Sequence, residues 1–589
     1  MTQTMDQAAG TTGTAGARGD QRRPTGGLEA HYSLRDLAGW FIEILSPETR
    51  YFWLAVIYGI AISVLTLAVP LSVQMLIDTI ANTALVQPLV VLSLMLFSLL
   101  ALQGVLRALR THLMEIYGRR VYARLMADFS LRAVYAQASF FENRKRDVLF
   151  HRYFDIMTLQ RNIPELLIGA FAIFLQGIIG FAVVSFYHPV FLGFNLALIV
   201  LIFLVWQIWG PSAIRTGVDL SDAKYEGAAW LDHLGSANSL YQSRRHIEHA
   251  LDRSEALTAN YIAQEKRHFR RTFAQTIALL FLYAFASAAL LGLGGWLVIR
   301  GQLSLGQLVS AELIMSAIFV GMAEFDSYLR RFYYVCMAVA EISELYEIPL
   351  EETNGERFPE DAHFNLHFHD VHLSARSRSA RFNFTIPAGV TLRVETEAEV
   401  LERMVNALLE RNETPEHGYI SIGDIDIATC DVHRLRQDLI VERRPTIMDG
   451  SIVDFLTLSG ADPASHGEMF EMLRLVGIEE IVRELDDGLD TVLSPIGLPL
   501  SPEETLRLKL AGSLLAQPRV LVVGEVFELI NRSVWERVLA YVAKRPHMTF
   551  VLFTDDDTLP HVDHVLQLGW EEQTLEPPAP ASDASEVNS

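Results

Sequence analysis

The residues of this chain whose types and positions could do chemistry are mainly carboxylates in its last third. Glu525 ends the segment "VLVVGE", and Glu503 and Glu504 stand in the polar turn "LSPEE", which precedes an apolar helix. A carboxylate at the end of a buried strand is a group that could act as a general base. The spacing therefore raises the question of whether these acids serve a reaction at all.

Four more glutamates follow the apolar run "TLRV" at the next place where a strand should lead into a helix: Glu395, Glu397, Glu399 and Glu402. A turn that binds phosphate needs glycines, whose N–H groups approach the oxygens, and a lysine. Between Val390 and Glu410 there is neither glycine nor lysine. Like charges about 4 Å apart repel by about 1 kcal/mol in water and about 4 kcal/mol at intermediate dielectric. This turn is therefore predicted to repel an anion.

The composition indicates the elements that must position these acids. The chain has 589 residues, of which 50% are hydrophobic, too long for one domain and too apolar for an ordinary soluble protein. Its formal charge of -22 argues against a nucleic-acid partner. With only Cys336 and Cys430, a disulfide framework is not expected.

Six long apolar runs, nearly free of charge, predict membrane-spanning helices, because about 20 apolar residues cross the hydrocarbon core. They lie at about 51–75, 85–106, 164–187, 190–210, 273–299 and 305–325. These runs define a membrane domain over 49–345. An interfacial helix is expected at 29–48, and disordered tails at 1–28 and 574–589.

The loop charges predict the orientation of the six spans. The links "LIDTIANTA" and "YHPV" carry no Lys or Arg, whereas 107–161 and 211–271 are rich in both. Because positive loops stay cytoplasmic, both termini are expected inside a cytoplasmic (inner) membrane. Beyond the spans, over 350–573, short strand-like runs alternate with helices, as is typical of a soluble α/β domain.

Taken together, this organisation resembles an ABC exporter half-transporter over nearly the whole chain. The segments "GGWLVIRGQLSLGQLVSAELIM", "LRQDLIVERRPTIMDGSIVDFL" and "DGLDTVLSPIGLPLS" are similar to the family's fifth-to-sixth span turn, glutamine loop and approach to the signature helix. The resemblance implies a fold class of six transmembrane helices followed by a RecA-like α/β nucleotide-binding domain.

Position by position, however, the resemblance implies a degenerate nucleotide site. Ala375 stands where the family has an adenine-stacking aromatic residue, and Arg443 stands for the glutamine that senses the γ-phosphate. Gly524 replaces the metal-holding aspartate, and Asp555 replaces the switch histidine. Glu525 keeps the position of the catalytic base. Without the metal ligand and the phosphate cradle, it is not expected to organise phosphoryl transfer.

The turn that would cap the ATP of an opposite subunit is altered as well. Ser501 is retained, but Pro502, Glu503 and Glu504 stand where the family has two glycines and a glutamine. Proline lacks the backbone N–H, and the glutamates add negative charge. A pseudo-ATPase on both faces is predicted, with no cofactor of its own and with ATP and Mg only through a partner subunit.

Two acids in the sixth span are candidates for a substrate cavity. Glu312 and Glu324 fall within or near this span, and intramembrane acids are costly enough to suggest a function. The alternative is that Glu324, like Asp326, reaches water at the cytoplasmic end. His561 and His564 have no third ligand at metal spacing, so no metal site is expected.

These observations leave competing functions. The first is a non-catalytic subunit of an ABC exporter, paired in the membrane with an ATPase-competent half-transporter. The second is an ATP-independent scaffold or regulator that retains exporter architecture, as a homodimer. An active exporter with unusual nucleotide chemistry is a third, against which the altered positions argue.

Overall fold

The computed structural model describes residues 39–40, 42, 49–82, 86–141, 147–352, 355, 364–375, 378–460 and 465–577. The tail predicted at 1–28 lies outside these residues, as does nearly all of the interfacial helix predicted at 29–48. Contacts divide the chain into two compact units. The first comprises Met1–Asp128 and Phe150–Tyr346, and the second comprises Phe129–Leu149 and Glu347–Ser589.

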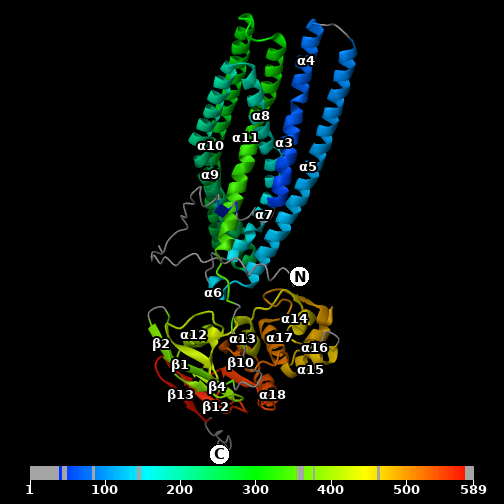
Figure 1. The fold of residues 1–589 in the computed structure, drawn as a ribbon. Coiled ribbons are helices and arrows are strands. Elements are labelled where there is room, and N and C mark those ends of the chain that lie inside the picture. The colour runs from blue at the N-terminus through cyan, green and yellow to red at the C-terminus, as the bar shows by residue number, and fades with distance from the viewer. Residues whose placement is uncertain are drawn as a thin grey trace, which may run out of the picture. The chain divides into compact units, whose positions relative to one another are not determined.

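The first unit is a bundle of long helices (Figure 1). Its main helices are α3 (Thr49–Thr66), α4 (Ala68–Asn82), α5 (Val86–Val134), α7 (Tyr153–Ile168), α8 (Ala170–Tyr187), α9 (Pro189–Ser236), α10 (Arg244–Ile299) and α11 (Leu305–Tyr346). Among the described residues, six stretches are long and apolar enough to cross a membrane, and each overlaps one predicted span. The prediction of six spans is thereby confirmed.

Several helices continue far beyond their apolar parts. At about 1.5 Å per residue, the 56 residues of α10 extend over about 84 Å, whereas the hydrocarbon core measures about 30 Å. The apolar window of α5 is only 6% buried within the chain, so its side chains face the surroundings. The charged extensions therefore continue outside the hydrocarbon.

Buried polar contacts tie three of these extensions together. Arg152 Nε lies 2.5 Å from Glu341 Oε2, and the Tyr225 hydroxyl donates to Asp155 Oδ2 at 2.5 Å. These pairs join α11 to the start of α7 and α9 to α7. Buried charges of this kind are tolerated because each has a partner.

The second unit contains two larger sheets. In the six-stranded sheet, the order is β13-β12-β4-β11-β10-β7, with every pair parallel except β12 and β13. The strands are β4 (Thr391–Thr396), β7 (Leu439–Glu442), β10 (Val520–Val523), β11 (Thr549–Phe553), β12 (His564–Leu568) and β13 (Gln573–Glu576). Residues 574–576, assigned from composition to the C-terminal tail, thus form part of β13.

An antiparallel sheet of five strands accompanies it. Its path is β2-β1-β5-β6, with β3 on β1. The strands are β1 (Leu366–Ala375), β2 (Arg378–Phe382), β3 (Thr385–Ile386), β5 (His417–Ile422) and β6 (Ile425–Asp426). Helix α12 (Glu399–Leu409) packs its apolar face on the cluster that both sheets share, with Leu401 and Leu408 fully buried. Sheets combined with helices confirm the α/β class; the RecA-like assignment stays a prediction.

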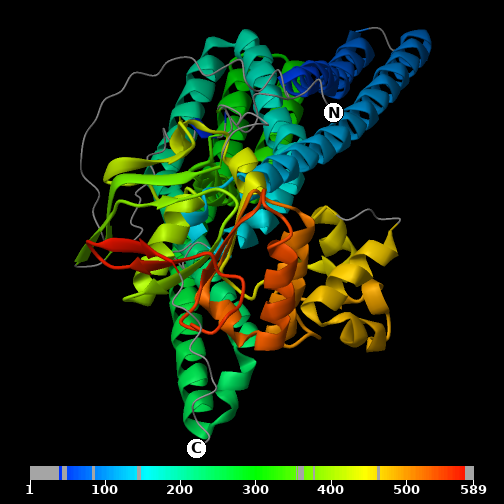
Figure 2. The same cartoon turned by 90° about the horizontal axis from the view of Figure 1, so that it is seen from below.

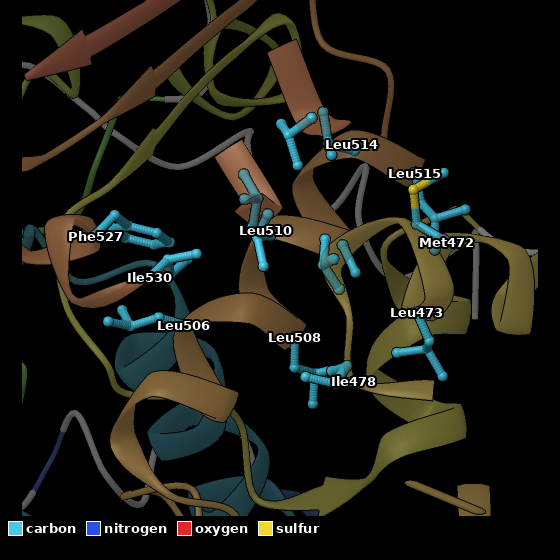
Figure 3. Packing of buried hydrophobic residues seen from close by; sticks show 14 of the residues in the cluster. Met472, Leu473, Ile478, Leu506, Leu508, Leu510, Leu514, Leu515, Phe527 and Ile530 are labelled. Carbon is cyan, nitrogen blue, oxygen red and sulfur yellow. The ribbon is translucent and has the colours of Figure 1, made fainter. Parts of the chain in front are cut away.

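A group of helices, α14 (Ile452–Leu458), α15 (His466–Val476) and α16 (Glu479–Glu484), lies on the side of this unit away from β12 and β13 (Figure 2). It is held to α17 (Pro502–Leu515) by aliphatic side chains. Leu508 of α17 lies beside Ile478, and Leu515 lies beside Met472 (Figure 3). Because nine α17 residues are buried, this helix is the centre of the cluster.

The segment Phe129–Leu149, between two spans, clusters with the second unit rather than the first. Gln137 N donates to Pro349 O at 3.0 Å, Glu351 N donates to Tyr135 O at 2.8 Å, and the Tyr135 ring meets His433. The predicted membrane domain over 49–345 is contiguous in sequence, whereas these contacts assign Phe129–Leu149 of that range to the second unit.

Candidate functional site

The candidate residues of the α/β unit gather at the carboxyl ends of its parallel strands. Glu397 and Glu399 follow β4, Gly524 and Glu525 follow β10, and Asp555 follows β11. Arg443 follows β7. The carboxyl edge of a parallel sheet is where α/β proteins bind ligands. These six residues are therefore brought to one edge, although not all to one point.

The centre of this edge is occupied by the carboxylate of Glu402. Its Oε1 and Oε2 accept from the backbone N–H of Glu525 at 3.3 and 3.4 Å, and Asn406 Nδ2 donates to Oε1 at 3.3 Å. A Cβ placed on Gly524 would overlap Glu402 Oε1. The missing side chain at 524 is therefore what makes room for the carboxylate of Glu402.

This carboxylate is buried, with 8% of the Glu402 surface exposed. Burial raises the pKa of Glu402 to about 7, and the nearby charges of Glu525 and Glu399 add to the rise against the lowering effect of the Glu525 N–H. Asn406 is fully buried, and its Oδ1 has no hydrogen-bond partner. A proton on Glu402 relieves the cost of placing a charge here.

The glutamates on the turn after β4 are not all directed at this point. Glu395 lies within the strand, where Arg393 Nη2 is 2.5 Å from its Oε1 and Gln567 Nε2 donates to its Oε2. Glu397 donates its backbone N–H to Leu568 O at 3.2 Å. Glu399 is the first residue of α12, where a negative charge is favoured by the helix dipole. The helix start is thus occupied by the chain's own acids.

Around Glu525 the field is negative. Desolvation, followed by the charges of Glu528, Asp555 and Glu399, raises its pKa. Glu528 is itself held by Thr554 Oγ1 at 2.6 Å and by the N–H of Asp555 at 3.0 Å. Glu525 and Asp555 are exposed. Among the residues that the structure describes, no Lys, Arg or His forms an ion pair with Glu525, so no cation there compensates its charge.

Arg443 and Ala375 are turned to structural partners. Arg443 Nη2 lies 2.9 Å from Glu410 Oε2, at the far end of α12 from Glu402, and burial raises the pKa of Glu410 against the effect of Arg443. Ala375, the last residue of β1, packs against the apolar cluster of both sheets. Neither residue lies free at the carboxyl edge.

The turn "SPEE" forms the start of α17. The Ser501 hydroxyl accepts from Glu504 N at 3.3 Å, and Glu504 Oε2 accepts from Ser501 N at 2.8 Å, which makes a capping box with Pro502 in the first turn. Glu503 pairs with Arg507 one turn later. The carboxylates of Glu503 and Glu504 therefore already have partners within this helix.

Sequence reasoning missed several partners in this region. Glu410, Asn406 and Glu528 were not singled out, although Asn406 stands at i+4 from Glu402, a spacing that signals contact along one helix face. A second pair, Lys509 with Glu442 at 2.7 Å, joins α17 to β7, and Ser513 donates to the same carboxylate. No local signal predicts such a pair, because 67 positions separate its members.

In the membrane unit, the two cavity candidates differ. Glu312 of α11 is half-buried, and its Oε2 has no hydrogen-bond partner. Glu324 is exposed. Asp326 is held by Thr276 and by Arg330, whose Nη1 is 2.5 Å away. Among the described residues, no group of three or more His, Cys, Asp or Glu could hold a metal ion.

This architecture defines a class: a multi-pass membrane protein in which six spans precede an α/β unit. Residues 52–224 match the model of the ABC transporter transmembrane region. A solved bacterial Atm1-family ABC exporter with ATP bound superimposes with a TM-score of 0.73 at 18% identity, covering 90% of this chain and 95% of that one. The chain therefore has the fold of an ABC exporter half-transporter with a six-span transmembrane domain.

Curated relatives agree with this assignment. The alpha-hemolysin translocation ATP-binding protein HlyB of Escherichia coli O157:H7 is 22% identical over 505 residues, 84% of this chain and 70% of that protein. The leukotoxin translocation ATP-binding protein LktB of Bibersteinia trehalosi is 22% identical over 506 residues, with the same coverage. This chain thus resembles two ATP-binding translocation proteins, although the carboxyl edge of its own parallel sheet is acidic.

Proposed function

We propose that this chain is a non-catalytic subunit of an ABC-type exporter, a pseudo-ATPase that works in the membrane with an ATPase-competent half-transporter. The observation that carries the proposal is the carboxylate of Glu402, which fills the space beside Gly524 at the carboxyl edge of the sheet. A subunit with this edge contributes spans and a docking partner to the exporter, while the other subunit supplies the nucleotide chemistry.

The residues present do not fit a magnesium triphosphate. Phosphoryl transfer depends on a cradle of backbone donors, a cation for the outer phosphates and a metal held by fixed ligands. Here the N–H of Glu525 is already satisfied by Glu402, and the turn after β4 offers neither glycine nor lysine. The surrounding side chains, Glu399, Glu528 and Asp555, would repel phosphate oxygens. No catalytic step is therefore assigned to Glu525.

A partner subunit is supported by the form of α17. Its capping box and the pair between Glu503 and Arg507 keep the helix start well ordered, although Pro502 removes one backbone donor. An ordered helix start at this position favours a surface that still docks against another subunit, since a surface without a role would not need to stay ordered. In the same proposal, ATP and Mg belong to that partner.

Nucleotide binding by the purified full chain tests the pseudo-ATPase assignment. In lipid nanodiscs, we expect no saturable binding of Mg-ATP below about 100 μM, equivalent to about −5.5 kcal/mol, and no hydrolysis. The double variant Glu402→Ser with Gly524→Asp should remain inactive, because the glycines and the lysine are still missing. Saturable binding by the unaltered chain would overturn the assignment.

The partner is tested separately by purifying the tagged chain from its native membrane. A second ABC subunit with complete nucleotide motifs should co-purify in a stoichiometric amount, and ATP hydrolysis should accompany it. Recovery of homodimers alone would favour the second function, an ATP-independent scaffold or regulator that retains exporter architecture.

A further inference from the structure

A cavity of about 340 Å³ opens among three helices of the membrane unit, α9, α10 and α11. Its charged lining consists of Lys266 and Glu265 from α10 and Arg330 from α11. Phe269 and Tyr334 supply aromatic surface. The cavity is thus a mixed site with two cations and one anion, remote from the acidic edge of the α/β unit in sequence and in chemistry.

The cations of the cavity differ in their present partners. Arg330 is bonded to Asp326 one turn earlier, at 2.5 Å. Lys266 has no ion pair in the part of the chain that the structure describes, and it is exposed. The run "KRHFRR" places three further arginines, at 267, 270 and 271, beside it. The electrostatic potential around the cavity mouth is therefore positive, and Lys266 is available to an anion.

On each of the three helices, a lining residue lies at a similar distance from the end of the apolar run. On α10 the uncharged run begins at Phe273, seven residues from Lys266, and on α11 it ends at Ala323, seven residues from Arg330. On α9 it ends at Ile214, six residues from Leu220. At about 1.5 Å per residue, Leu220, Lys266 and Arg330 lie about 9–11 Å beyond the apolar runs. The headgroup layer outside the hydrocarbon is about 5–8 Å thick on each side, so Phe269 and Thr272 of the cavity lie within it, and the long side chain of Lys266 borders its outer side.

Exposed aromatic rings lead from the cavity toward the apolar run. Phe269 is 61% exposed and Phe273 is 50% exposed, and their rings stack with centroids 5.3 Å apart. Aromatic side chains at the boundary between headgroups and hydrocarbon are typical of protein surfaces in contact with lipid. The surface from Lys266 to Phe273 therefore changes from charged to apolar over two turns, as a phospholipid does from its phosphate to its acyl chains.

We propose that this cavity binds the headgroup phosphate of a glycerophospholipid, with Lys266 and Arg330 as its charged partners and the ring pair Phe269 and Phe273 against the acyl chains. Basic pockets between membrane helices at the interface are suited to such headgroups. Glu265 favours a headgroup that carries a hydroxyl or ammonium donor beside the phosphate. The site is independent of the proposed loss of ATPase activity.

The test uses the full chain, delipidated in detergent, and native mass spectrometry with palmitoyl-oleoyl-phosphatidylglycerol. We expect binding of this lipid to weaken about fivefold in Lys266→Gln, the effect of one basic residue at a membrane surface. The matched control is Arg270→Gln, which removes an exposed charge of the same helix that does not line the cavity. That variant should lose much less binding than Lys266→Gln, because Arg270 contributes only to the general potential.

Two further probes separate the possible sources of the ligand chemistry. Diacylglycerol, which has no phosphate, and inorganic phosphate, which has no acyl chains, should each bind far more weakly than the phospholipid. Equal losses in Lys266→Gln and Arg270→Gln would reduce the effect to general surface charge and overturn the site. Binding of inorganic phosphate at the strength of the lipid would overturn the lipid as its ligand.

Discussion

At the scale of single residues, a carboxylate lies at the acidic edge, but it comes from position 402 and not from position 524. The resemblance to ABC exporters implies a carboxylate at position 524, yet the structure has glycine there and a carboxylate from Glu402 in the adjoining space. A Cβ at position 524 would force the end of the Glu402 side chain to move, so the two positions are coupled.

The coupling predicts a non-additive pair of substitutions. Gly524→Ala should destabilise the chain by about 1–3 kcal/mol, because its Cβ would overlap Glu402 Oε1. Combining it with Glu402→Ser, which removes the obstacle, should recover most of that loss. Thermal unfolding of the four proteins of the cycle in nanodiscs measures the coupling energy.

The control for this cycle is Gly467→Ala, in helix α15 of the same unit. A Cβ at Gly467 meets nothing within 4 Å, so alanine there should leave stability unchanged or raise it slightly. If the changes in unfolding free energy caused by Gly524→Ala and Glu402→Ser were additive, the two side chains would not compete for the same space.

A second residue-scale prediction concerns pH. Since folding raises the pKa of Glu402 from 4.5 to about 7, the folded state binds more protons than the unfolded state between these values. The stabilisation is complete below about pH 4.5 and is lost as the pH rises through 7. Between pH 5 and 8 the chain should lose on the order of 1–3 kcal/mol relative to Glu402→Gln.

The midpoint of thermal unfolding, followed from pH 5 to 8 in parallel for both proteins, measures this difference. Glu480→Gln, an exposed glutamate of the same unit, serves as the control and should track the unaltered chain. Parallel curves for Glu402→Gln and the unaltered chain would show that Glu402 is ionised at neutral pH in the folded state.

At the scale of elements, the start of α17 carries its own stabilisation. The hydroxyl of Ser501 and the carboxylate of Glu504 satisfy each other's backbone N–H groups, and Pro502 begins the helix with a favourable φ. The helix centre then packs into the apolar cluster through Leu508 and Leu510. The four-residue turn is therefore a structural cap, whatever it faces in an assembled exporter.

The cap predicts a measurable cost when it is removed. Ser501→Ala should lower the free energy of unfolding by about 1 kcal/mol, within the range of about 0.5–2 kcal/mol found for such caps. Glu504→Gln should cost less, because glutamine can still close the capping box. Denaturation of the full chain in nanodiscs checks both values.

Ser533→Ala is the matched control, since it deletes the same hydroxyl from an exposed position in the first turn of α18 (Arg532–Val542) without removing its cap, Asn531. We expect a change of less than about 0.5 kcal/mol. A cost for Ser501→Ala no larger than this control would show that the cap contributes nothing to stability.

At the scale of the whole molecule, the membrane unit follows the plan of an exporter, whereas the carboxyl edge of the α/β unit does not follow its chemistry. The six helices, the long charged extensions and the buried pair between Arg152 and Glu341 form a complete membrane framework. This framework is the reason for proposing a transport role rather than a scaffold role.

Orientation is the prediction that belongs to this scale. With both termini inside, a cysteine at Gln302, between α10 and α11, should react with an impermeant maleimide applied to intact cells. A cysteine at Ser236, at the end of α9, should react only after permeabilisation. Both positions are exposed, and Cys336 and Cys430 are replaced by alanine beforehand. Labelling of Ser236→Cys in intact cells would reverse the assignment.

Some features of this protein are determined by the sequence alone. Six spans follow from runs of about 20 apolar residues, since a helix in hydrocarbon satisfies its own backbone and needs no partner to be recognised. The α/β class follows from short alternating strands and helices. The missing glycines and lysine after β4 are likewise plain from the letters, because a cradle of backbone donors cannot be built without them.

Only the tertiary structure decided where the acids point. Glu402 and Glu525 are 123 positions apart, yet one accepts a hydrogen bond from the other. Arg443, at the position of the family's glutamine, pairs with Glu410, while Glu503 and Glu504 form their contacts within their own helix. Such pairings form only when strands that are distant in sequence meet at one edge of a sheet. A local pattern of residues does not show which distant residues will meet.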